Sequence, residues 1–279
     1  LKERFLGIHF FNPPRYMKLV EVIPGEETKK EVVEYVTRFC EDVLGKGVVV
    51  CKDVPNFVAN RIGVYDMSNA MNLMLAKGMK VEDIDAIISA PLGRPRSAIF
   101  GTIDLVGLDT AYHVMTNLYE ALPKDESRDL FIPPDFVKAM IQKKWLGNKT
   151  KGGFYKKSKD AKGKKVKLAI DVKTLEYVPA DKPKYESIGA AKKSEAPVEQ
   201  TVKMVFNGKD AAAELVREYL CNNFIYAANR IPEIADTVVE IDNAMKWGYN
   251  HALGPFETWD AVGVKEAVEV MKQLGKKVP

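Results

Sequence analysis

Hydrophobic positions in the first part of the chain alternate between strand-like and helix-like spacing. Residues 4–11 and 17–23 are short runs with high β-propensity, separated by an Asn-Pro-Pro-Arg turn signal, so they predict two strands. Apolar residues recur at helical spacing through 27–44, and the apolar run at 47–53 predicts a buried strand. We therefore expect 1–54 to form part of an α/β layer in the order strand, strand, helix, strand.

From residue 55 onward the hydrophobic pattern is mainly helical. Asn56 is a favourable N-cap residue, and the positions that follow it at helical spacing form one mostly apolar stripe. That stripe comprises Asn60, Val64, Met67, Met71 and Met74. Further helices are predicted within 98–122 and 134–145, so we expect 55–155 to be a helical domain.

The next segment, 156–208, differs in composition. Its first part, 156–193, contains twelve lysines and five acidic residues around two strand-like runs that are joined by Lys173. This charge pattern favours a solvated hairpin or linker over a packed core. A phosphate-binding role for the lysines is the less favoured alternative, because a run of charge on a protein surface usually faces only water.

An internal repeat relates two distant parts of the chain. The stretch 84–115 aligns with 241–271 after a gap of one residue. The later parts of the two stretches share identical residues: Phe100, Thr102, Asp104, Val106, Gly107, Ala111, Val114 and Met115 match Phe256, Thr258, Asp260, Val262, Gly263, Ala267, Val270 and Met271. We therefore predict that 209–279 is a second copy of the helical domain and that it packs on the first copy within one chain.

Composition narrows the classes of partner. The formal net charge of +4 is small and the charges are interspersed, so nucleic acid is not expected as a partner. Three cysteines lie far apart without C-x-x-C spacing, which predicts neither a disulfide framework nor a metal site and is typical of a reducing cytoplasm. No apolar run approaches the roughly 18 residues that a membrane span requires, so no membrane association is expected.

His9 is the most informative of the three histidines. It lies at the end of an apolar strand, where a titratable group needs either a partner or a function. If the strands at 4–11 and 17–23 pair in antiparallel fashion, Glu21 becomes its cross-strand neighbour, with side chains about 5 Å apart. The carboxylate would then orient the imidazole as a general base. From these residues alone, a purely structural pair is the more common interpretation.

Three stretches of the chain resemble the signature sequences of one enzyme family. They are HFFNPPRYMKLVEVIPG (9–25), DVPNFVANRIG (53–63) and LGNKTKGGFYK (146–156), and they are similar to stretches of 3-hydroxyacyl-CoA dehydrogenases in order and separation. The resemblance covers essentially the whole chain. It implies an α/β remnant of a Rossmann-type NAD-binding domain at 1–54, followed by a mostly α-helical, duplicated C-terminal dehydrogenase domain.

The resemblance also implies roles for five residues. His9 takes the proton of the substrate's 3-hydroxyl, Glu21 pairs with His9, and Asn60 lies against the reacting oxygen. Asn12 and Lys149 touch the nicotinamide end of NAD. Taken by themselves, Asn60 could instead close a strand–helix junction, Asn12 could be only a turn residue, and Lys149 could be only a solvated lysine.

We therefore expect an NAD-dependent oxidoreductase of fatty-acid or short-chain acyl-CoA metabolism that oxidises (S)-3-hydroxyacyl-CoA to 3-oxoacyl-CoA, as in β-oxidation. Two alternatives stay open: the dehydrogenase part of a bifunctional enzyme with a fused or associated enoyl-CoA hydratase, and a non-catalytic helical assembly module. The family's Gly-rich dinucleotide loop and catalytic serine are absent from the sequence, so we interpret the chain as a fragment that does not turn over substrate alone. The second copy is expected to be silent, because Val216 or Arg217 stands where Asn60 does in the first.

Overall fold

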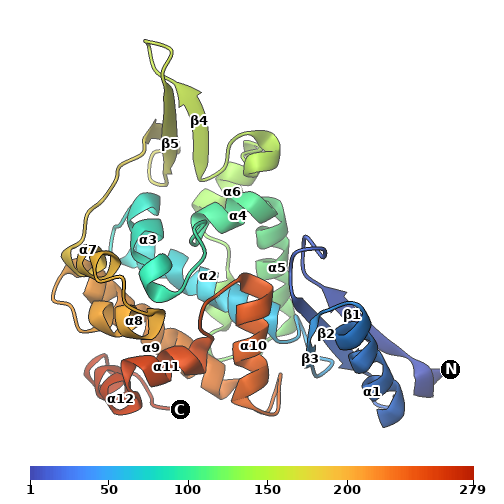
Figure 1. Ribbon diagram of the computed structural model, residues 1–279. Coiled ribbons are helices and arrows are strands. Elements are labelled where there is room, and N and C mark those ends of the chain that lie inside the picture. The colour runs from blue at the N-terminus through green and yellow to red at the C-terminus, as the bar shows by residue number, and fades with distance from the viewer. The chain divides into compact units, whose positions relative to one another are not determined.

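The computed structural model describes all 279 residues of the chain (Figure 1). They divide into two compact units. The first unit joins Leu1–Gly63 with Leu220–Pro279, and the second is Val64–Tyr219. The division falls inside the two longest helices, α2 (Ala59–Ala76) and α9 (Ala211–Asn229). None of the helices combines the length and the apolar character needed to cross a membrane.

A three-stranded sheet lies in the first unit. β1 (Leu6–Phe10) pairs in antiparallel fashion with β2 (Leu19–Pro24), which runs parallel to β3 (Gly47–Val50). Between β2 and β3 the chain forms α1 (Lys30–Arg38), which continues into a short π-helical segment (Phe39–Val43). The order predicted for this part, strand, strand, helix, strand, is confirmed. The first five residues of β2 are buried, as expected of the central strand of a sheet.

Helices complete the first unit. They are the start of α2, the end of α9, α10 (Val238–Tyr249), α11 (Pro255–Val262) and α12 (Val264–Gln273). Thr237, the N-cap residue of α10, forms a capping box with Glu240. The helix packs against β2 and β3. The approach is close at Gly47, where a Cβ atom would lie 2.4 Å from Cε3 of the Trp247 ring. The sheet therefore fixes the position of α10.

The second unit combines short helices with a second sheet. Its helices are α3 (Val81–Ile87), α4 (Phe100–Val106), α5 (Leu108–Ala121), α6 (Asp135–Gln142), α7 (Glu186–Lys193) and α8 (Val198–Phe206). Its antiparallel strands are β4 (Tyr155–Lys159), β5 (Lys165–Asp171) and β6 (Glu176–Pro179). The hairpin of β4 and β5 projects from the helices of this unit (Figure 1). Phe100 and Phe154 pack against each other in the core of the second unit, with ring centroids 4.5 Å apart.

The segment 156–208 holds more structure than the hairpin or linker that its composition predicted. β5 and β6 coincide with the two predicted strand-like runs, but α7 and α8 occupy much of the remainder. The prediction of a linker was wrong there, because α7 and α8 are short helices whose apolar positions become buried only through tertiary packing. The buried face of α8 comprises Thr201, Val202, Val205 and Phe206.

One local arrangement occurs in both units. Asp85 in α3 accepts hydrogen bonds from backbone N–H groups at the start of α4, and Asp242 in α10 does the same at the start of α11. Burial raises the pKa of each carboxyl to about 6. A glycine with positive φ then separates each capped helix from the next: Gly107 at 109° before α5 and Gly263 at 110° before α12.

Candidate active site

His9 and Glu21 face each other across β1 and β2. They are directly opposite in the strand register, and His9 Nδ1 lies 2.6 Å from Glu21 Oε2. The His9 side chain is about one-third exposed at 33%, whereas that of Glu21 is at 0%. The predicted contact is therefore present, and the imidazole is partly exposed while its partner carboxylate is fully buried.

The second carboxylate oxygen of Glu21 caps a helix. Oε1 accepts hydrogen bonds from the backbone N–H groups of Val58 at 3.1 Å and Ala59 at 2.8 Å, where α2 begins. These N–H groups have no partner within the helix, and the positive end of the helix dipole favours a carboxylate there. With both oxygens engaged, Glu21 cannot rotate without losing a buried hydrogen bond. The imidazole of His9 is thus oriented by a group that is itself fixed.

The turn before α2 differs from the sequence prediction. Asn56, predicted as the N-cap, lies three residues before the helix begins, and the capping oxygen comes from Glu21 instead. Asn56 and Phe57 both have positive φ, at 62° and 50°, and this left-handed turn brings the next two N–H groups to the carboxylate. The Phe57 ring also packs near His9, with a centroid distance of 5.7 Å. A distant carboxylate as helix cap leaves no local signal in the sequence.

The fixed carboxylate determines which nitrogen of His9 can act as a base. When Nδ1 carries its proton toward Glu21, the lone pair of the neutral ring is on Nε2. The Phe11 ring, whose centroid is 4.7 Å from that of His9, packs against the imidazole from the same end of the sheet. The arrangement can take a proton at Nε2 and stabilise the resulting imidazolium through Glu21.

Asn60 lies in the first turn of α2, next to the residue whose N–H is held by Glu21. Its side chain is half-buried, and its Oδ1 accepts a hydrogen bond of 3.0 Å from the hydroxyl of Tyr249, the last residue of α10. Tyr249 was not among the residues that the sequence suggested for the site. The two residues are 189 positions apart, so no motif or spacing links them.

Asn12 and Lys149, the two residues expected to touch NAD, lie in different units. Asn12 is exposed just after β1, and no side-chain hydrogen bond joins it to His9 or Glu21. Lys149 belongs to a short turn of the second unit, where its Nζ lies 2.5 and 2.7 Å from the two carboxylate oxygens of Asp109. This hydrogen bond lowers the pKa of the Asp109 carboxyl. In the first unit, Glu21 thus links His9 on the sheet to the start of α2, where Asn60 lies, and Asn12 follows β1 three residues after His9.

The third signature stretch, 146–156, folds around one carboxylate. Asp104 accepts hydrogen bonds of 2.8 Å from the backbone N–H groups of both Phe154 and Tyr155. Backbone at Gly147 and Gly153 lies directly against Asp104, where added Cβ atoms would be only 2.4 and 2.0 Å from its atoms. Gly147 and Gly153 therefore have a structural explanation, because they allow the turn that carries Lys149 to lie against Asp104.

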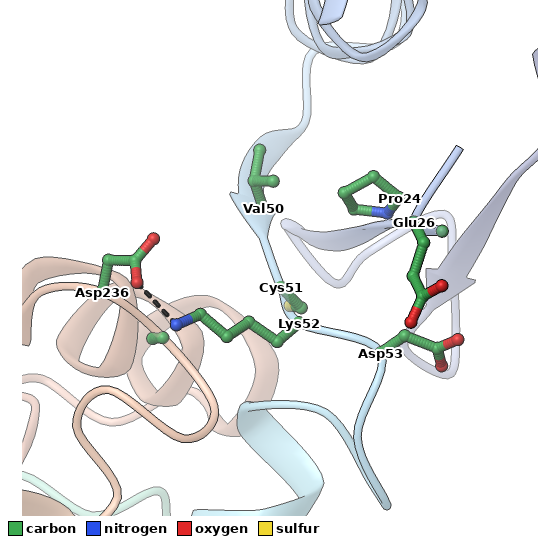
Figure 2. A pocket seen from close by; sticks show the side chains of 9 residues that line it. Pro24, Glu26, Val50, Cys51, Lys52, Asp53 and Asp236 are labelled. Carbon is green, nitrogen blue, oxygen red and sulfur yellow. Dashed lines mark ion pairs between the residues drawn. The ribbon is translucent and has the colours of Figure 1, made fainter. Parts of the chain in front are cut away.

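A separate hollow of about 430 Å³ lies at the carboxyl ends of β2 and β3 (Figure 2). Its walls include Pro24, Gly25, Glu26, Val50, Cys51, Lys52, Asp53, Ala235 and Asp236. Figure 2 shows the Lys52 side chain extended to Asp236, with which it forms an ion pair of 2.6 Å. Burial raises the pKa of the Cys51 thiol, so it is not a reactive thiolate. The hollow does not include His9, and we assign no chemistry to it.

Comparison with known proteins gives the family. The NAD binding domain model of 3-hydroxyacyl-CoA dehydrogenase matches residues 1–54, and the C-terminal domain model matches 57–157 and 220–279. The chain is 43% identical over 278 residues to a probable 3-hydroxyacyl-CoA dehydrogenase of Bacillus subtilis (strain 168), covering 100% of this chain and 34% of that protein. It is 35% identical over 258 residues to a putative fatty acid oxidation complex trifunctional enzyme of Rickettsia prowazekii (strain Madrid E), covering 92% and 34%.

Among solved structures, 3-hydroxybutyryl-CoA dehydrogenase of Escherichia coli K12 has a TM-score of 0.69 at 23% identity, with 98% of this chain and 66% of that chain covered. This likeness shows the fold: an NAD-binding domain with a helical C-terminal domain. The chain spans about a third of the length of the two curated relatives described above, 34% in each case. From the matches of both family models along most of its length, the chain belongs to the 3-hydroxyacyl-CoA dehydrogenase family.

Proposed function

We propose that this chain carries the proton-transfer site of an NAD-dependent (S)-3-hydroxyacyl-CoA dehydrogenase of fatty-acid metabolism, which oxidises the 3-hydroxyl to a 3-oxo group. The observation that carries the proposal is the 2.6 Å contact of His9 with the fully buried carboxylate of Glu21. A buried carboxylate that holds an accessible imidazole in one tautomer is the arrangement that a general base needs. Membership of the family supports the choice of substrate class.

Each residue of the site has a separate task. Nε2 of His9 accepts the proton of the 3-hydroxyl, so that the oxygen does not build up a full negative charge as the carbonyl forms. Glu21 keeps Nδ1 protonated and stabilises the imidazolium. Asn60 offers its amide N–H to the same oxygen and so stabilises the partial charge that develops on it.

The cofactor for this chemistry is NAD, which accepts the hydride from C3 when it is bound. Asn12 is proposed as a contact to the nicotinamide end, because its exposed amide follows β1, three residues after His9. Lys149 is proposed as a second contact to the cofactor. Its present partner, Asp109, would have to share or release the ammonium group.

We further propose that the helical domain is duplicated and that the two copies pack on each other within one chain. Support comes from the shared sequence and from the matched helix caps at Asp85 and Asp242, each followed by a glycine at equivalent φ, Gly107 and Gly263. A single copy would need a second subunit to cover its apolar face. In this proposal the second copy covers that face, so we expect no obligate dimer through it. Light scattering of the full-length gene product tests this: a dimer formed by the first copy would refute it.

A hydratase partner is proposed from the relatives. Two of them are named as a putative fatty acid oxidation complex trifunctional enzyme and as a fatty acid oxidation complex subunit alpha, the latter 32% identical over 283 residues in Acinetobacter baylyi. We expect the full-length gene product to contain or bind an enoyl-CoA hydratase. Hydration of a 2-enoyl-CoA by the purified protein, with or without co-purified partners, measures this directly.

The dehydrogenase proposal is tested on the full-length gene product by NADH formation. We expect (S)-3-hydroxybutyryl-CoA plus NAD to produce NADH, and the (R) enantiomer to serve as the control that does not. An enzyme that reduces NAD with neither enantiomer, at short or long acyl chains, would contradict the proposed function.

A further inference from the structure

Tyr249 lies in the part of the chain that is predicted to be a silent second copy. Its hydroxyl donates to Oδ1 of Asn60 at 3.0 Å, and both residues belong to the first unit. An amide group can present either its oxygen or its NH₂ group in a given direction, because the two orientations have almost the same shape. A donor that holds the oxygen therefore decides where the NH₂ group points.

The close approach of Tyr249 to α2 depends on Gly63, one turn after Asn60. A Cβ atom at Gly63 would lie 2.2 Å from Cζ and 2.5 Å from the hydroxyl oxygen of Tyr249. Any other residue at this position would displace the tyrosine ring from the helix. Because Gly63, three residues after Asn60, has no side chain, the Tyr249 ring can lie against α2 and its hydroxyl can reach the Asn60 amide.

The other side of Tyr249 is held by the sheet. Its ring meets that of Phe11 edge to face at 6.3 Å, and Phe11 in turn packs on His9 at 4.7 Å. The neighbouring Gly248 lies so close to β2 that a Cβ atom there would be 2.7 Å from Cδ2 of Leu19. Tyr249 is thus fixed against the same strands that carry the His9 and Glu21 pair.

The corresponding residue of the first copy lacks the hydroxyl. The alignment of the repeat runs without a gap from Ile84 and Ile241 to Gly93 and Asn250, both of which are left-handed, with φ of 69° and 54°. In this alignment the buried Leu92 of the first copy corresponds to Tyr249 of the second. The donor therefore belongs to the second copy alone, and it is not a feature that the repeat requires for folding.

We propose that Tyr249 is a positioning residue for the dehydrogenase reaction, and this inference rests on the proposed function. By donating to Oδ1, its hydroxyl keeps the Asn60 NH₂ group available to the reacting oxygen. With the amide reversed, a carbonyl oxygen would face the substrate hydroxyl and compete with His9 for its proton. The segment after Leu220 thereby completes the active site of the first copy.

The test is a set of variants of the full-length gene product. Tyr249→Phe keeps the ring and removes only the hydroxyl, and we expect a fall in kcat of about 3- to 10-fold, as for loss of one hydrogen bond, with the KM for NAD unchanged. Asn60→Ala lowers kcat further, and adding Tyr249→Phe to it has no additional effect, because the hydroxyl acts only through the amide. Tyr35→Phe, at an exposed position on α1, is the matched control and leaves the rate unchanged.

Gly63→Ala is an independent variant, because its methyl group displaces the tyrosine ring without removing the hydroxyl. It should lower kcat at least as much as Tyr249→Phe. A kcat of Tyr249→Phe equal to that of the wild type overturns the inference. So does a Tyr249→Phe substitution that lowers kcat by the same factor on the wild-type and on the Asn60→Ala background. If the wild type fails to oxidise any 3-hydroxyacyl-CoA, the proposed function fails, and the inference falls with it for that separate reason.

Discussion

Replacing Glu21 by Gln separates the catalytic role of the carboxylate from its structural role. Gln has almost the same shape, so its amide oxygen can still accept from the N–H groups of Val58 and Ala59. Its NH₂ group then faces Nδ1 of His9, which must become an acceptor. The proton of the neutral imidazole moves to Nε2, and the base that should take the substrate proton is no longer available.

The size of the effect follows from the role. General-base catalysis contributes about 10²- to 10⁴-fold, so E21Q should lower kcat by at least about 10²-fold, or about 2.7 kcal/mol in activation free energy. The KM for the acyl-CoA should change little, because the carboxylate is fully buried behind His9 and does not touch substrate. The assay is NADH formation from (S)-3-hydroxybutyryl-CoA and NAD by the full-length gene product. Glu27→Gln, at an exposed ion pair with Lys2, is the control. An E21Q rate equal to wild type would refute the reasoning.

Three further predictions concern stability and are measured by urea denaturation of the full-length gene product. Glu21→Ala leaves two backbone N–H groups and His9 without a partner and should cost about 2–5 kcal/mol, whereas E21Q should cost less than half as much; equal losses would contradict the cap. Asp104→Ala should likewise cost about 2–5 kcal/mol, because Phe154 and Tyr155 lose their acceptor; a change below about 0.5 kcal/mol would be at odds with this. Burial raises the pKa of the Asp85 and Asp242 carboxyls to about 6 in the folded state, whereas an aspartate in the unfolded chain has a pKa of about 3.9. Between these two pH values the folded state therefore binds more protons than the unfolded state. The contribution of each carboxyl to the free energy of unfolding should therefore rise by about 1 kcal/mol from pH 7 to pH 5, and Asp85→Asn should remove one such increment; an unchanged pH dependence would contradict it.

The part of the site that could be predicted from sequence is the part encoded locally. His9 and Glu21 lie on two strands joined by one turn, and the side-chain period of two residues fixes which positions face each other. Tertiary contacts over long separations carry no such signal. The capping of α2 by Glu21 spans 37 and 38 residues, and the Tyr249 contact to Asn60 spans 189.

The fold was predictable to a similar extent. Strands and long helices with clear hydrophobic periods were located correctly, as for β1 and β2. The segment with α7 and α8 was not, because its apolar patterns are short and become buried only through tertiary packing. The capping aspartates Asp85 and Asp242 fall at aligned positions of the repeat, but their role becomes clear only from the backbone of the following helix.

The most direct test of the central claim, that His9 is the base, is the single-turnover rate of NADH formation in His9→Ala. The full-length gene product is mixed with saturating NAD and (S)-3-hydroxybutyryl-CoA, and His113→Ala serves as the control, since His113 is exposed on α5 and has no carboxylate partner. We predict a rate lower by about 10²- to 10⁴-fold in His9→Ala and an unchanged rate in the control. A His9→Ala enzyme that forms NADH as fast as wild type would contradict the account.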